Sequence, residues 1–163
     1  MDASAFVSEY PQISNRLMSP ATLKNGGNET KVQALWDTGA SRTCISTDVV
    51  ISLGLVPLGK QQMQTPSGPS VANTFQIDIL LPNNVIVQDL VVCDSAIGAL
   101  GIGALIGMDI INLGDFAVSN FDGKTVFTFR TPSQAKTNYV SDLRRQRIIG
   151  PTHGKGKGSK KKK

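Results

Sequence analysis

The sequence predicts an all-β protein built from about eight short strands with one or two short helices. Three observations lead to this fold class: apolar and polar residues alternate in short runs, turn-forming residues separate the runs, and stretches with helical periodicity are brief. At 163 residues, of which 40% are hydrophobic, the chain has room for one domain with a buried core and for a tail.

Each expected strand is bounded by turn-forming residues or by a break in the alternation. Phe75, Ile77 and Ile79 alternate with polar residues, which predicts a strand with one buried face and one exposed face. Asp122-Gly123 is a strong hairpin signal. The strands are expected at residues 21–23, 31–36, 44–46, 61–65, 71–79, 85–87, 90–92, 116–121 and 125–129.

The expected helices are short. Thr47 is a suitable N-cap for a helix over residues 48–53, which should stop at Gly54. A second short helical run ends at Gly114. Residues 1–18 show no clear period, and we expect them to form a peripheral segment.

Charge divides the chain into two parts. Residues 1–130 carry seven Lys and Arg against eleven Asp and Glu, whereas residues 131–163 carry ten Lys and Arg against Asp142 alone. Such a basic tail cannot bury a core, so we expect disorder there apart from a short helix near residues 139–149. The predicted organisation is an N-terminal segment over 1–18, one β domain over 19–130 and a basic tail over 131–163.

Composition argues against several other classes. The two cysteines, Cys44 and Cys93, are too few for a disulfide framework and are expected to be reduced and buried. The single histidine, His153, lies in the basic tail, which argues against a His-dependent triad, and no Cys/His cluster suggests a metal. The charge-free stretch at 95–108 is too short to cross a bilayer and no signal peptide is visible, so we expect a cytoplasmic protein without membrane contact.

The most informative motif is Asp37-Thr38-Gly39-Ala40-Ser41, which directly follows the apolar run at residues 32–36. A carboxylate at the end of a buried strand must be paired, hydrogen-bonded or protonated, because burial of a lone charge is costly. Glycine at the third place allows close approach by a backbone or a ligand. The motif occurs once in the chain.

This motif, its preceding strand and the later run Leu105-Ile106-Gly107 before a short helix resemble the retropepsin-like aspartic proteases over roughly residues 20–130. The resemblance implies a closed β-barrel and a homodimer in which Asp37 of each copy forms half of a catalytic dyad. It implies that Thr38 interlocks the two loops and that Gly39 lets the substrate backbone pass. No cofactor or metal is implied.

The resemblance also suggests roles for the neighbouring segments. Ala40 stands where pepsin-like enzymes have a hydroxyl donor, so we expect activity at mildly acidic to near-neutral pH. The tip Thr65-Pro66-Ser67-Gly68 is similar to a flap that closes over bound peptide, with an ordinary surface hairpin as the alternative. Leu105 to Gly107 would form a loop wall behind the catalytic loop.

The expected function is therefore an aspartic endopeptidase that cleaves extended peptides or proteins. Two alternatives stay open: a catalytically silent binding or assembly module with the same fold, and a dimeric nucleic-acid adaptor that acts through its tail. The Lys and Arg residues within 144–163 suit nonspecific binding of nucleic acid or of an acidic partner, but a solvated charge run explains them equally well.

Overall fold

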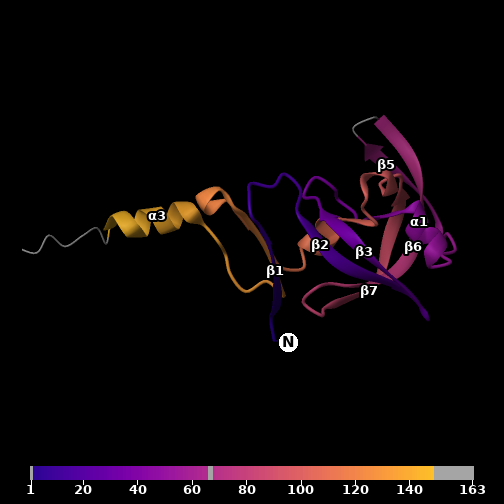
Figure 1. Cartoon of the computed structure of the whole chain (residues 1–163), viewed down its shortest axis with the longest axis horizontal. Helices are drawn as coiled ribbons and strands as arrows, with labels where there is room; N and C mark the ends of the chain where they lie inside the picture. The colour runs from indigo at the N-terminus through magenta and orange to yellow at the C-terminus, as the bar shows by residue number, and fades with distance from the viewer. Residues whose placement is uncertain (1, 66–67, 149–163) are drawn as a thin grey trace, which may run out of the picture.

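The computed structural model describes residues 2–65 and 68–148. Within these ranges it contains ten strands, three α-helices and two 3₁₀ helices, so the predicted all-β class with few helices is confirmed (Figure 1). The strands are β1 (Ser4–Tyr10), β2 (Met18–Asn25), β3 (Asn28–Trp36), β4 (Cys44–Ser46), β5 (Gly59–Thr65), β6 (Gly68–Leu80), β7 (Ile86–Ser95), β8 (Ala104–Ile106), β9 (Asp115–Ser119) and β10 (Thr125–Thr131). The α-helices are α1 (Thr47–Ser52), α2 (Met108–Ile111) and α3 (Tyr139–Ile148), and the 3₁₀ helices are Gly98–Leu100 and Phe121–Gly123.

Six strands close into a barrel. Their order is β2-β3-β8-β4-β7-β6, and pairing of β6 back onto β2 completes the ring. The pairs β3–β8 and β4–β7 are parallel, whereas the hairpin pairs β2–β3 and β6–β7 are antiparallel. Because the barrel is closed, the paired residues of these six strands do not lie at a free sheet edge. Their backbone N–H and C=O groups are hydrogen-bonded to neighbouring strands.

A long strand carries a hairpin outward from this barrel. The first half of β6 pairs with β5 in the register Thr65↔Gly68 to Gly59↔Thr74, and its second half pairs with β7. The hairpin expected from residues 61–65 and 71–79 is thus confirmed. In Figure 1 it extends away from the barrel on the side opposite to α3.

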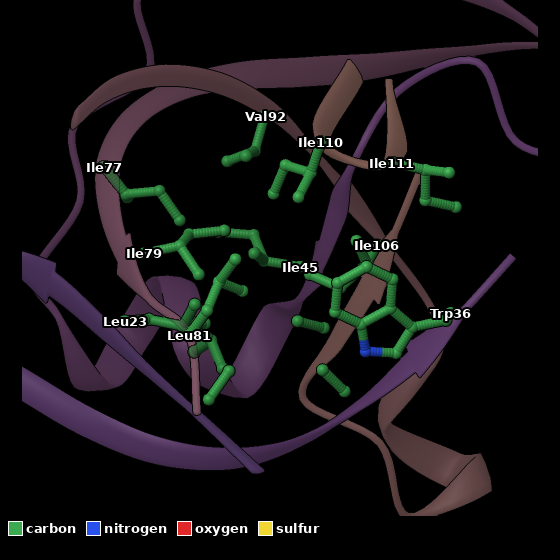
Figure 2. Packing of buried hydrophobic residues seen from close by; sticks show 14 of the residues in the cluster. Leu23, Trp36, Ile45, Ile77, Ile79, Leu81, Val92, Ile106, Ile110 and Ile111 are labelled. Atoms are coloured by element: carbon green, nitrogen blue, oxygen red, sulfur yellow. The ribbon is translucent and has the colours of Figure 1, made fainter. Parts of the chain in front are cut away.

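The barrel interior is filled by aliphatic side chains from several strands and from α2 (Figure 2). Leu23, Ile45, Ile79 and Ile106 are fully buried, and the alternation at Ile77 and Ile79 places both of these side chains inside. This packing supplies most of the driving force for folding, because each fully buried aliphatic side chain contributes on the order of 1.5–3 kcal/mol.

A second, three-stranded sheet of order β1-β10-β9 carries an aromatic cluster. Phe127 and Phe129 of β10 are fully buried, and the ring centroids of Trp36 and Phe129 lie 4.9 Å apart. The indole N–H of Trp36 donates to the hydroxyl of Ser19 at 2.9 Å, which satisfies the one polar atom of a buried ring. The end of β3 is therefore fixed by aromatic packing directly before residue 37.

Part of the peripheral N-terminal segment is integrated into this sheet. Residues 4–10 form β1, which pairs antiparallel with β10 from Ser4↔Thr131 to Tyr10↔Thr125. The sequence pattern did not reveal this strand, because its partner lies more than 110 residues away. The division of the chain at residues 18 and 130 stays a prediction.

The helix after β4 starts one residue earlier than expected. The N-cap is Ser46, which keeps the extended backbone of β4 and accepts a hydrogen bond from the N–H of Val49 at 3.4 Å; Thr47 is already helical. The stop is as predicted, since Gly54 adopts a positive φ of 60° just beyond the helix.

The segment after β10 is tied back to the second sheet by Asp115. Its carboxylate accepts hydrogen bonds from the Ser133 hydroxyl and the Gln134 backbone N–H, and it forms an ion pair with Arg130. These donors hold the pKa of Asp115 well below its usual range, the Gln134 N–H having the largest effect.

Beyond this anchor lies α3, the short helix expected near residues 139–149. It projects away from the strands in Figure 1, and the side chains of Tyr139, Val140 and Leu143 are exposed. Residues 149–163, for which disorder is predicted, fall outside the described residues, whereas residues 133 and 134 of the same tail are bound to Asp115. Within the ranges that are described, no helix is long and apolar enough to cross a membrane.

Replacement of Phe127 by alanine tests the aromatic cluster. Because the ring is fully buried, Phe127→Ala should lower the free energy of unfolding by about 3–5 kcal/mol, measured by urea denaturation. Phe121→Ala is the matched control, since that side chain is 88% exposed and its loss should change stability by less than about 0.5 kcal/mol. Equal effects of the two substitutions would contradict the proposed core.

The Asp115 anchor should make stability depend on pH in the acidic range. A carboxyl whose pKa is lowered by folding stabilises the native state above its unfolded pKa of about 3.9, and this contribution is lost as the pH falls further. The stability difference between wild type and Asp115→Asn should therefore be constant from neutral pH to about pH 5 and shrink below about pH 4. Thermal unfolding across this range measures it; a difference that grows on acidification would contradict the assignment.

Candidate active site

Asp37 is the first residue after β3 and begins a tight loop. Its backbone N–H donates to the carbonyl of Ile106 at 2.9 Å, which extends the β3–β8 pairing to the start of the loop. The backbone N–H of Gly39 donates to the Asp37 carboxylate oxygen Oδ1 at 2.8 Å. The half-buried carboxylate is thus held by the backbone of its own loop, as the sequence position predicts.

The rest of the loop rests on the chain between β8 and α2. The N–H of Met108 donates to the carbonyl of Ala40 at 2.8 Å. At Gly107 the two backbones touch: a Cβ added there would lie 2.5 Å from the Arg42 carbonyl carbon and 3.0 Å from the Ala40 oxygen. Only glycine fits at this contact, so the expected loop wall at residues 105–107 lies directly behind residues 40–42.

A side-chain bridge locks the same two segments together. Asp109 accepts a hydrogen bond from the Thr43 backbone N–H at 2.8 Å and another from the Thr43 hydroxyl at 2.7 Å. The buried Thr43 hydroxyl oxygen also accepts from the N–H of Gly107 at 3.1 Å. The carboxylate of Asp109 also accepts a hydrogen bond from the N–H of Ile110 in α2, but its main partner is Thr43, 66 residues away.

The loop opens onto a cleft of about 680 Å³. Asp37, Gly39, Ala40 and Leu105 line it on one side, and strand β5 lines it on the other. The further lining residues are Ser41, Arg42, Cys44, Gln61, Gln62, Met63, Gln64, Cys93 and Ser95. The cleft therefore combines one carboxylate, one guanidinium, several amides and an apolar floor. A cleft of this size is of the order that small ligands or a short peptide segment occupy.

The two cysteines form part of that floor. Cys44 and Cys93 are register partners in the parallel pair β4–β7, and both are free and buried, as expected. Burial, reinforced by the nearby Cys93, raises the pKa of the Cys44 thiol to about 11, so it remains protonated near neutral pH. Across the ranges described, no three His, Cys, Asp or Glu side chains come together as a metal site.

The predicted site residues fall into three groups. The structure brings Asp37, Gly39 and Ala40 together at the cleft, and it places Ile106 and Gly107 behind them. Thr38 is exposed, and its hydroxyl makes no hydrogen bond inside the described part of the chain. The expected flap residues Thr65 and Gly68 pair at the end of the β5–β6 hairpin, while Pro66 and Ser67 lie outside the described residues.

Several cleft residues were not predicted. The body of β5, from Gln61 to Gln64, lines the cleft, although the sequence analysis placed the substrate contacts at the hairpin tip. The sequence of β5, Gly-Lys-Gln-Gln-Met-Gln-Thr, has no regular alternation of apolar and polar residues, and four consecutive residues of the strand line the cleft, so no local pattern marked them. Arg42 lines the same cleft.

Comparison with known proteins agrees with this geometry. The model of a family described as "gag-polyprotein putative aspartyl protease" matches residues 25–112, which is more than half of the chain and includes both the Asp37 loop and its supporting segment. A comparison with curated proteins gives no match.

A solved structure of a retropepsin-like protease has a similar fold. A retropepsin-like aspartic protease from Rickettsia conorii superposes with a TM-score of 0.51 at 13% identity, covering 80% of this chain and 94% of that one. The EIAV protease complexed with the inhibitor HBY-793 gives a TM-score of 0.47 at 18% identity, covering 61% and 88%. At 13% identity, the similarity to the Rickettsia conorii protease shows the fold alone.

Replacement of Gly107 by alanine tests the backbone contact behind the Asp37 loop. Because the added Cβ would meet the carbonyl group of Arg42, Gly107→Ala should lower the free energy of unfolding by about 1–3 kcal/mol in chemical denaturation. Gly27→Ala is the matched control, because a Cβ there meets nothing within 4 Å. A Gly107→Ala protein as stable as the control would show that the contact is looser than described.

Proposed function

The chain belongs to the gag-polyprotein aspartyl protease family and has the retropepsin-like fold, and from this premise we propose that it is a homodimeric aspartic endopeptidase. In this proposal the two Asp37 carboxylates of a dimer form the catalytic dyad. The observation that carries it is the position of Asp37. Its carboxylate accepts a hydrogen bond from the backbone of its own loop, and the residue lines the cleft.

The exposed surface of the loop supports the dimer. Thr38 and Gly39 are exposed in the single chain, directly beside a half-buried carboxylate. Their exposure leaves them available to a second copy related by a two-fold axis. Since each chain carries one Asp-Thr-Gly motif, the second acid of a dyad must come from Asp37 of the partner subunit.

The chemistry of such a dyad follows from the electrostatics of two adjacent carboxylates. Two carboxylates a few ångströms apart do not both ionise, so the pair shares one proton. The ionised member takes a proton from a water molecule as that water attacks the scissile carbonyl. The protonated member donates to the carbonyl oxygen, and the two exchange roles as the amine leaves.

The lining of the cleft favours extended peptides. Strand β5 runs along one side of it, and a strand with free backbone groups recognises an extended chain by main-chain hydrogen bonds. The floor, formed by Cys44, Cys93 and Leu105, suits apolar side chains next to the cut. The β5–β6 hairpin, including Thr65 and Gly68, would close over the bound peptide.

The proposal is tested by Asp37→Asn. This change keeps an oxygen for the Gly39 N–H but removes the charge, so cleavage of a library of extended peptides should fall at least about a hundredfold with little change in the unfolding midpoint. Asp122→Asn, at an exposed position that is not part of the cleft lining, should retain full activity. Wild-type specific activity should also rise with protein concentration and then level off, because only the dimer holds both acids.

The outcomes separate the alternatives. Loss of cleavage in Asp37→Asn, together with inhibition of the wild type by pepstatin, fits the protease. Cleavage that persists in Asp37→Asn would contradict it. A folded dimer that cleaves no peptide would favour the binding or assembly module. Nucleic-acid binding through residues 144–163 that is equal in wild type and in Asp37→Asn would identify the adaptor.

A further inference from the structure

Arg42 is a cleft residue that the proposed mechanism does not use. Its backbone is fixed, because its carbonyl group packs against Gly107 and the next residue is bonded to Asp109. Its side chain is nevertheless exposed, and the residue lines the cleft together with Asp37. The backbone of Arg42 is therefore fixed, and its long cationic side chain lies at the wall of the cleft.

Within residues 2–65 and 68–148, no carboxylate forms an ion pair with the Arg42 guanidinium. Across the described ranges its nitrogens have no hydrogen-bond or ion-pair partner, and the two ion pairs found there, Lys24–Glu29 and Arg130–Asp115, involve other residues. An arginine with five donors usually satisfies them with carboxylates, carbonyls or water. Arg42 is thus free to bind a group that enters the cleft.

The charge of Arg42 acts on the floor of the cleft. Burial raises the pKa of the Cys93 thiol, the positive charge of Arg42 opposes this shift, and the more weakly acting carboxylates of Asp94 and Asp109 add to it. The field of the guanidinium thus extends to the buried side of the cleft. Apart from Asp37, the lining residues near it are neutral, including the amides of Gln61 and Gln62.

We propose that Arg42 selects peptides with an acidic side chain close to the cut. This inference rests on the proposed protease function and adds the class of substrate. A planar guanidinium binds a carboxylate with two parallel hydrogen bonds, and the low water content of a closed cleft strengthens them. In a two-fold dimer each half of the cleft contains one Arg42, so the preference acts on both sides of the scissile bond.

The experiment compares matched peptides. In each pair an extended peptide with an apolar centre carries Glu or Gln at one position flanking the cut, and kcat/KM is measured for both. Wild type should prefer the Glu peptide by about three- to tenfold at one or more positions, and this ratio should decline at high salt. Arg42→Gln should bring the ratio to about one, and Arg42→Glu should favour the Gln peptide.

Lys124→Glu is the control for charge alone, because it makes the same change of net charge at an exposed residue that is not part of the cleft lining. It should keep the wild-type ratio. A ratio near one for the wild type at every position, or a preference that Arg42→Glu leaves unchanged, would overturn the inference.

Failure of the protease function is recognised separately. If no Asp37-dependent cleavage occurs, binding of the same fluorescent peptide pairs to the Asp37→Asn protein is measured by anisotropy. Tighter binding of the Glu peptides that is lost in the Asp37→Asn/Arg42→Gln double variant would support the role of Arg42 without catalysis. Equal binding of Glu and Gln peptides, or no binding of either, would reject it.

Discussion

The contact between the backbone at Gly107 and the backbone of residues 40–42 is the constraint on which the site depends. It brings the segment between β8 and α2 close enough for the Ala40 carbonyl to accept from Met108 and for Thr43 to meet Asp109. A side chain at position 107 would separate the two segments and break these bonds together. The placement of Asp37 is therefore a property of two segments about 70 residues apart, which meet at Gly107 because a Cβ there would have no room.

The second sheet contributes to the same placement through Trp36, the last residue of β3. Trp36 packs among phenylalanines of β1, β9 and β10 and is hydrogen-bonded to Ser19, so β3 is fixed up to its last residue. The adjacent residue, Asp37, then leaves the sheet with its N–H bonded to Ile106. Hydrophobic packing before the loop and polar bonds after it act on opposite sides of one carboxylate.

Local signals explain which features were predictable. The hairpin at β2–β3 and the turn at Asp122-Gly123 are encoded by residues that adopt positive φ, among them Gly26 at 57° and Gly123 at 70°. The Asp37 loop is likewise a continuous motif next to a recognisable strand. Strand β1 could not be predicted from its seven residues alone, because its pairing partner is at the opposite end of the domain. The cleft lining and the Thr43–Asp109 bridge depend on distant strands, and no local pattern reports which side chains will face each other.

The double pairing of β6 has a mechanical consequence. Thr74 is the point at which this strand passes from one neighbour to the other, since it faces Gly59 of β5 on one side and Cys93 of β7 on the other. On the C-terminal side of this residue the strand pairs with β7, and at residues 78–80 it pairs with β2 as well. On the N-terminal side it pairs with β5, and the N–H of Asn73 donates to the carboxylate of Asp94 in β7. The outer part of the hairpin therefore joins the barrel at Thr74, whose neighbour Cys93 lines the cleft, so bending of the hairpin at this residue would leave the barrel pairing intact.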